Sequence, residues 1–121
     1  ALPCPAERIP DPNDAGAMAD ACRLGFEHGA DVLKTYATGS AESFRKVTAG
    51  CPAPVLIAGG PKMDSERAVL QVVRDTLDAG GMGVVFGRNI WQSPQPAKMI
   101  QALRHLIHAD GRVDEAAELL R

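Results

Sequence analysis

The sequence lacks a strong charge bias, a long apolar stretch and a regular set of cysteines. Its net charge is −2 over 121 residues, and its basic residues form no run or stripe, so a nucleic-acid partner is not expected. No apolar stretch approaches the roughly 18 residues that a membrane span requires. The first residues show no basic segment followed by an apolar one, so no signal peptide is expected. These absences favour a cytoplasmic globular domain, and the chain is long enough for one hydrophobic core.

The cysteines and histidines do not suggest a disulfide framework or a metal site. Cys4, Cys22 and Cys51 are odd in number and irregularly spaced, which fits reduced cytosolic thiols. Cys22 falls on the apolar side of a predicted helix, so we expect it in the core. His105 and His108 are three residues apart and could share a metal, but no third ligand accompanies them. We therefore expect no metal and place both histidines at an exposed helix end.

Short apolar segments alternate with amphipathic helices along the chain. Apolar strands are expected within 29–36, 54–62 and 83–89, and the last two segments carry glycines after the strand. Helix signals between them include capping residues, proline near a first turn and apolar residues at helical spacing. Helices are expected up to about His28 after a cap at Asn13 or Asp14, over 41–49, from Asp64 to Gly80, over 95–108 with Ser93 as the cap, and over 113–120.

The strands predict a parallel sheet, because they are apolar throughout and helices separate them. Their spacing of about 25–30 residues is typical of (β/α) repeats, but three strands cannot close a barrel of eight. A three-stranded parallel sheet would also leave two edges unprotected. The pattern is consistent with a small open α/β unit, and it favours the C-terminal portion of a larger (β/α)8 barrel.

Lys34 ends the first predicted strand, and we interpret it as a nucleophile. Active sites of parallel α/β folds lie at the C-terminal ends of the strands. Ala30 and Val32 share its side of the strand, and apolar neighbours would favour the neutral amine that attacks a carbonyl carbon. The alternative is a lysine that simply reaches water at a strand end.

Glycines follow the next two strands and suggest a phosphate site. Gly59 and Gly60 end the second strand, and Gly87 and Arg88 end the third. Glycine lets backbone N–H groups approach a phosphate closely, and an arginine guanidinium can bind two phosphate oxygens at once. Lys62 could add positive charge there, or could simply be solvated. Together with Lys34, these loops indicate Schiff-base chemistry on a phosphorylated carbonyl compound.

From about Asp14 onward, the chain resembles the C-terminal part of the archaeal-type class I fructose-bisphosphate aldolase family. That family also includes the autoinducer-2 phospho-sugar thiolase and aminodideoxy-heptulosonate synthase. The resemblance rests on four motifs in the same order and spacing. These are Asp-Val-Leu-Lys-Thr-Tyr-Ala-Thr-Gly (31–39), Ser-Phe-Arg-Lys-Val (43–47), Cys-Pro-Ala-Pro-Val-Leu-Ile-Ala-Gly-Gly-Pro-Lys (51–62) and Gly-Arg-Asn-Ile-Trp-Gln-Ser (87–93).

The resemblance implies one partial barrel domain over 1–121. Residues 14–121 would supply the sixth to eighth strands with their helices, and 1–13 an irregular remnant of the fifth. It also implies roles for the site residues. Lys34 would be the Schiff-base lysine, Gly59 and Gly60 the phosphate loop after the seventh strand, and Gly87 and Arg88 the loop after the eighth.

The implied function is a class I aldolase that cleaves or forms C–C bonds of a phosphorylated sugar, without a cofactor. The sequence departs from the family pattern in having no tyrosine at positions 2–5, where the family places a proton donor, and in lacking the first four strands. Alternatives are therefore a thiolase or heptulosonate synthase that uses the same lysine, and an inactive barrel segment that serves as an interaction module. A homo-oligomer, or association with the missing barrel half, is expected.

Overall fold

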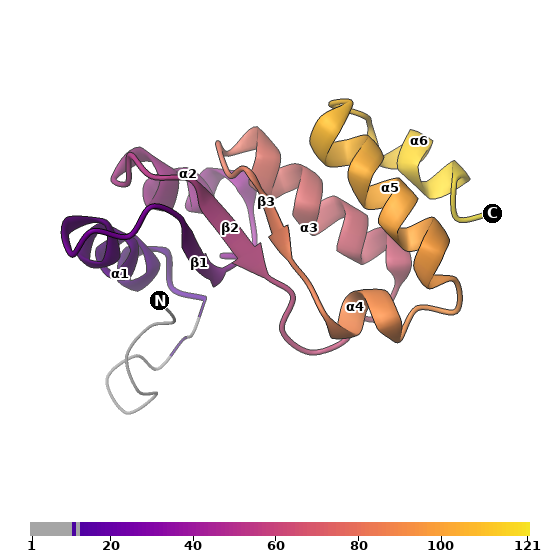
Figure 1. Ribbon diagram of the computed structural model, residues 1–121, viewed down its shortest axis with the longest axis horizontal. Helices are drawn as coiled ribbons and strands as arrows, with labels where there is room; N and C mark the ends of the chain where they lie inside the picture. Colours follow the sequence, from indigo (N-terminus) through magenta and orange to yellow (C-terminus); the bar gives the residue numbers. More distant parts are fainter. Residues whose placement is uncertain (1–10, 12) are drawn as a thin grey trace.

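The computed structural model describes Asp11 and residues 13–121, so the predicted remnant of the fifth strand lies almost wholly outside the described residues. The described chain alternates strands and helices in the predicted order (Figure 1). Its elements are α1 (Ala15–Glu27), β1 (Leu33–Tyr36), α2 (Ala41–Ala49), β2 (Val55–Ala58), α3 (Glu66–Asp78), β3 (Gly83–Val85), α4 (Arg88–Trp91), α5 (Pro96–His108) and α6 (Val113–Glu118).

The three strands form a parallel sheet in the order β1-β2-β3. Lys34 pairs with Leu56, which pairs with Gly83, and two residues further along Tyr36, Ala58 and Val85 form the next row. The parallel α/β architecture predicted from the sequence is confirmed. The strands are shorter than the apolar segments, because residues 29–32 turn the chain away from α1, with Gly29 in a left-handed conformation (φ 95°).

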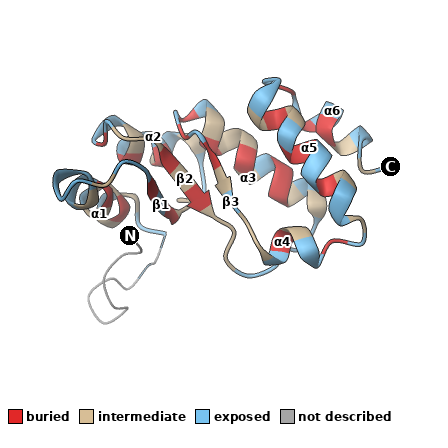
Figure 2. Cartoon of the chain, in the orientation of Figure 1, coloured by how far each residue is buried: buried red, intermediate tan, exposed pale blue. Residues whose placement is uncertain are grey.

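In the described part of the chain, the helices bury one face of the sheet and leave the other open. Leu33, Thr35, Val55 and Ile57 point toward the helices and are at most 2% exposed. The residues that alternate with them are half-buried or, like Lys34, exposed. Figure 2 colours each element by this burial. Because successive strand residues point to opposite faces, burial of the first set directs the second set to the open side.

The buried side chains form two clusters. The first packs α1 and α2 against β1 and β2 around Met18, Phe44 and Val47. The second packs α3, α5 and α6 together around Leu70 and Leu106. No helix in the described part of the chain is long and apolar enough to cross a membrane.

Two predicted helix starts were wrong. Helix α3 is capped by Ser65, whose hydroxyl accepts a hydrogen bond from the Ala68 amide, and not by Asp64. Ser93 does not cap α5, which starts at Pro96 with Gln95 at the N-cap position. The Ser93 hydroxyl instead donates to Glu66 and accepts from the Gln95 amide, so it ties the segment before α5 to the start of α3.

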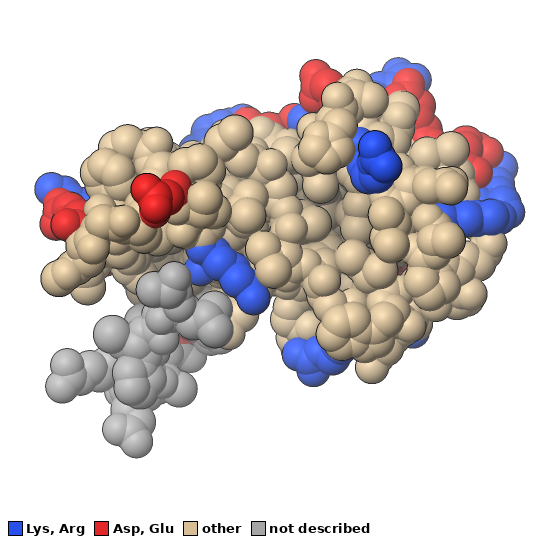
Figure 3. Space-filling model, in the orientation of Figure 1, with Lys and Arg blue, Asp and Glu red and all other residues tan. Residues whose placement is uncertain are grey.

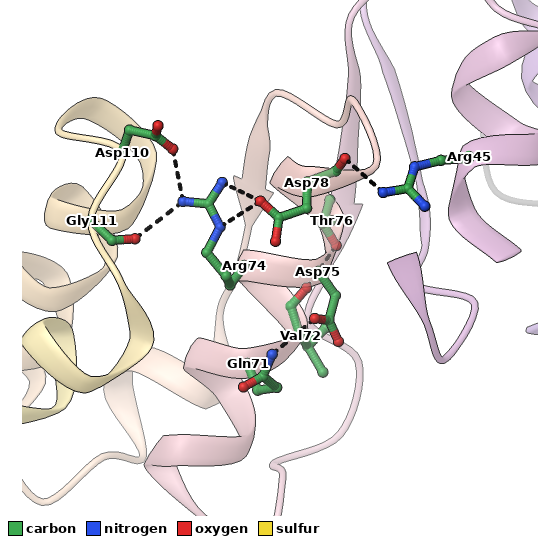
Figure 4. Close-up of polar contacts among 9 residues, drawn as sticks. All are labelled: Arg45, Gln71, Val72, Arg74, Asp75, Thr76, Asp78, Asp110 and Gly111. Carbon is green, nitrogen blue, oxygen red and sulfur yellow. Dashed lines mark hydrogen bonds and ion pairs between the residues drawn. The ribbon is translucent and has the colours of Figure 1, made fainter. Parts of the chain in front are cut away.

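Arg74 connects α3 to the turn between α5 and α6 (Figure 4). Its guanidinium donates to Asp78 (2.7 Å), to Asp110 (2.9 Å) and to the Gly111 carbonyl oxygen (3.1 Å). The side chain is only 17% exposed, so these charge-assisted hydrogen bonds are partly shielded from water. This network holds α6 against the second cluster.

Replacing Arg74 with Ala is expected to lower the free energy of unfolding by about 1–2 kcal/mol, because partly buried hydrogen bonds to charged groups are lost. Arg104→Ala is the matched control, since Arg104 is exposed on α5, and its effect is expected to stay within about 0.5 kcal/mol. Urea unfolding followed by circular dichroism measures both variants. Equal effects would show that the Arg74 network does not stabilise the fold.

Candidate active site

An open hollow of about 320 Å³ lies at the carboxyl ends of the three strands. All five residues that the sequence analysis selected line it, together with four apolar or aromatic neighbours. Its lining residues are Lys34, Tyr36, Ala58, Gly59, Gly60, Val85, Gly87, Arg88 and Trp91.

The parallel register explains why these residues meet. Tyr36, Ala58 and Val85 are paired across the sheet, and all three line the hollow. Gly60 and Gly87 each follow two residues after a member of this row, so the loops leave the sheet at the same edge. Carboxyl ends of parallel strands lie at one edge of a sheet, and the hollow is the consequence.

Lys34 projects onto the open face because its two neighbours are held on the other face. Leu33 is 1% exposed, and the Thr35 hydroxyl donates to the Met18 sulfur of α1 at 2.8 Å. The expectation that apolar neighbours desolvate the amine was wrong for this chain, since Lys34 is exposed and Val32 is 53% exposed. The described residues provide no further strands to cover this face. On the face drawn in Figure 3, basic side chains are scattered over a largely uncharged surface.

The Gly59–Gly60 loop needs glycine at both positions, for different reasons. A Cβ at Gly59 would lie 2.9 Å from the Phe86 ring and 3.1 Å from Asn89 Nδ2, so there is no room for it. Gly60 has φ +62°, a left-handed conformation that costs other residues strain. The backbone at this loop is therefore accessible and sharply turned.

The second loop leads directly into α4. Gly87 precedes the helix, and the Trp91 ring occupies the space that a side chain would need there, since a Cβ would lie 2.5 Å from the ring. Arg88 is the first residue of α4, and its exposed side chain lines the hollow. An arginine at this place can bind the anionic end of a ligand whose other end reaches Lys34.

Asn89 is the residue that the sequence analysis missed. It is 3% exposed and bonds three backbone groups of the loop after β2. The only signal for it in the sequence is its position directly after Arg88. Lys62, which was considered for the phosphate pocket, does not line the hollow, and its amine donates to the Gln92 carbonyl oxygen at the end of α4 (2.8 Å).

Cys22, Cys51 and His105 lie outside the hollow. Cys22 is 2% exposed, which confirms its predicted core position. Burial, with a smaller contribution from nearby Cys51, raises the pKa of the Cys22 thiol, so the thiol form is favoured. The His105 ring lies 3.1 Å from Glu115. Among the described residues, no group of three or more histidine, cysteine or acidic side chains is arranged to hold a metal ion.

The fold and the hollow together define a segment of a parallel (β/α) barrel with a lysine and two glycine loops at the carboxyl edge of its sheet. Residues 5–93 match the model of the DeoC/LacD family of aldolases. The chain belongs to this family. It is 43% identical to an uncharacterised aldolase of Saccharolobus solfataricus, over 82% of this chain and 36% of that protein. It is 39% identical to the 2-amino-4,5-dihydroxy-6-oxo-7-(phosphonooxy)heptanoate synthase of Streptomyces griseus, over 86% of this chain and 38% of the synthase.

Solved structures agree with this assignment. The chain superposes on an archaeal fructose 1,6-bisphosphate aldolase with a TM-score of 0.78 at 34% identity, covering 82% of this chain and 40% of the aldolase. A structure of an archaeal fructose-1,6-bisphosphate aldolase, described as having its catalytic lysine bound to the carbinolamine intermediate, gives 0.77 at 34% identity, over 80% of this chain and 39% of that one. The chain therefore spans less than half the length of these relatives. The predicted fold class, part of an aldolase barrel, is confirmed.

Gly60→Ala is expected to lower the free energy of unfolding by about 1–2 kcal/mol, because alanine is strained at positive φ. Gly50→Ala is the matched control: Gly50 has φ −91° and the nearest atom to an added Cβ is 3.8 Å away. We expect the control to be neutral or slightly stabilising in urea unfolding. If both variants lose the same stability, the left-handed conformation at Gly60 is not required.

Proposed function

We propose that this chain carries the nucleophile and the phosphate site of a class I aldolase that acts on a phosphorylated sugar or keto compound. The observation that carries the proposal is the single hollow shared by Lys34, Gly59, Gly60, Gly87 and Arg88. A nucleophilic amine and an anion-binding edge in one hollow suit a substrate that has a carbonyl group and a phosphate.

In the proposed reaction, the neutral amine of Lys34 attacks the carbonyl carbon and forms a carbinolamine. Loss of water gives an iminium ion, joined to the protein through the new C–N bond. When the bond between the α and β carbons breaks, the β-hydroxyl loses its proton and becomes the carbonyl group of the released aldehyde. The electron pair of the broken bond moves into the iminium system and forms an enamine. The iminium is itself the electron acceptor, so this scheme uses no cofactor. Tyr36, which follows Lys34 on the same face of β1, is placed to orient the bound substrate.

The phosphate would lie against the two glycine loops. Backbone N–H groups at Gly59, Gly60 and Gly87 can approach phosphate oxygens because no Cβ intervenes. Arg88 would add a charge-assisted hydrogen bond. Fixing the phosphate holds the carbonyl carbon near Lys34, and such positioning is a large part of the catalytic effect of many enzymes.

Fructose-1,6-bisphosphate is the substrate that the similarity to archaeal aldolases favours. The second candidate is a synthase reaction of the heptulosonate type, favoured by the 39% identity to the Streptomyces griseus synthase. A phospho-sugar thiolase reaction would use the same lysine. These reactions differ in the protein groups that contact the end of the substrate away from the phosphate. Most of those groups would come from the remainder of a complete barrel. The complete protein would be cytoplasmic.

Borohydride trapping tests the role of Lys34. With dihydroxyacetone phosphate present, reduction is expected to attach one three-carbon phosphate adduct to Lys34, detected by peptide mass spectrometry. Lys34→Met should abolish the adduct, whereas Lys46→Met, which removes an exposed lysine of α2, should leave it unchanged. A folded chain without an adduct, or with adducts spread evenly over its lysines, would refute the proposed nucleophile.

Trapping with fructose-1,6-bisphosphate separates two outcomes by mass. Cleavage before reduction leaves a three-carbon adduct, whereas imine formation without cleavage leaves a six-carbon adduct. We expect the six-carbon adduct to dominate in this chain alone. Proton transfer by a general acid or base contributes about 10²–10⁴-fold to such reactions, and the family's proton-donating tyrosine has no counterpart at residues 2–5.

Among the described residues, one face of the sheet is open and the outer edges of β1 and β3 have no partner strand, and such edges predict association with another chain. Light scattering is expected to give a mass above the 12.8 kDa of one chain. Val32→Asp, on the open face, should reduce association, whereas Leu119→Asp, at an exposed apolar position directly after α6, should not. A stable, folded monomer at all concentrations would argue against edge pairing and against the interaction-module alternative.

A further inference from the structure

We propose that Asn89 is a positioning residue that holds the glycine loop after β2 and Arg88 in one phosphate-binding arrangement. The inference rests on the proposed function, because it assigns a role to a residue behind the same hollow. Asn89 does not line the hollow. It acts through the backbone of the Gly59–Met63 loop.

The side-chain amide of Asn89 makes three hydrogen bonds to that loop. Its Nδ2 donates to the carbonyl oxygens of Gly59 (3.0 Å) and Pro61 (3.2 Å), and its Oδ1 accepts from the Met63 amide (2.8 Å). Both Nδ2 hydrogens are therefore used, and the amide orientation is determined, since the carbonyl oxygens can only accept and the Met63 amide can only donate. With 3% exposure, water does not readily replace these bonds.

Asn89 lies one residue after Arg88 in α4, so the hydrogen bonds of Asn89 also fix the position of Arg88 relative to the loop after β2. The Arg88 side chain faces the hollow, and the Asn89 side chain faces the loop that forms the hollow's opposite edge. Gly59 is packed against both Phe86 and Asn89. The two phosphate loops are thus connected through one short helix.

A second connection exists, but it is weaker. The exposed amine of Lys62 donates to the Gln92 carbonyl oxygen at 2.8 Å, and exposed bonds of this kind compete with water. Loss of Asn89 would leave the carbonyl oxygens of Gly59 and Pro61 and the Met63 amide without this partner. The loop would then adopt other conformations, and its N–H groups would no longer lie opposite Arg88.

Phosphate titration followed by ¹H–¹⁵N NMR tests this role on the chain itself, with inorganic phosphate as the probe. In the unmodified chain, the amides of Gly60, Gly87 and Arg88 are expected to shift together with a single dissociation constant. Asn89→Ala and Asn89→Asp should each weaken phosphate binding roughly tenfold, the effect typical of residues that orient ligand-binding groups. Asn89→Asp keeps the acceptor for Met63 and loses both donors. Its effect should be of the same size as that of Asn89→Ala, which adds no charge.

Two controls separate positioning from general stability. Gln101→Ala and Gln101→Glu make matched changes on the exposed face of α5 and should leave the dissociation constant unchanged. Leu106→Ala removes a fully buried side chain of α5 and should lower stability without changing phosphate affinity. An Asn89 variant that unfolds is replaced by Asn89→Ser, for which the same loss is expected.

The outcomes distinguish this inference from the function on which it rests. If the unmodified chain binds phosphate at these amides and the Asn89 variants bind equally well, the positioning role is wrong and the phosphate site stands. If the unmodified chain shows no phosphate shifts at Gly60 and Arg88, the proposed phosphate site is wrong, and the role of Asn89 is refuted with it.

Discussion

The burial of Leu33 and Thr35 beneath α1 determines the direction in which Lys34 points, and the site depends on this alternation. Leu33 and Thr35 are each 1% exposed, and the contact of Thr35 with Met18 anchors the strand. A shift of the strand by one residue would turn Lys34 into the helical layer and place Leu33 on the open face. The parallel pairing with β2 and β3 then carries the same alternation across the sheet. The lysine and both glycine loops reach one hollow because of this shared register.

The open face explains both the accessibility of Lys34 and the incompleteness of the site. A complete (β/α)8 barrel buries this face against its other strands. The chain covers about 40% of the archaeal aldolase it matches, so the covering strands have no counterpart in it. Desolvation of the amine, which favours the nucleophilic form, would come from those strands. The chemistry proposed for Lys34 thus combines a nucleophile held by this chain with an environment that a complete barrel provides.

The sequence predicted the architecture well because strand, helix and glycine signals agreed with one another. Lys34, Gly59, Gly60, Gly87 and Arg88 were found from their positions at strand ends, and all of them line one hollow. The helix α4 was not predicted, because it is only four residues long and its stability comes from packing and from its bonds to the loop after β2. The role of Asn89 depends on a contact between residues about thirty positions apart, which no local pattern reveals. The capping of α3 by Ser65 in place of the adjacent Asp64 was beyond sequence reasoning, since both residue types cap helices well.

The central claim is that the amine and the phosphate site act on the same molecule. The most direct measurement compares the rate of borohydride trapping at Lys34 for dihydroxyacetone phosphate and for unphosphorylated dihydroxyacetone at equal concentrations. The account predicts faster trapping of the phosphorylated ketone, and it predicts that Arg88→Ala or excess inorganic phosphate removes the difference. Equal rates for the two ketones in the unmodified chain would contradict it, because Lys34 would then react without help from the two glycine loops.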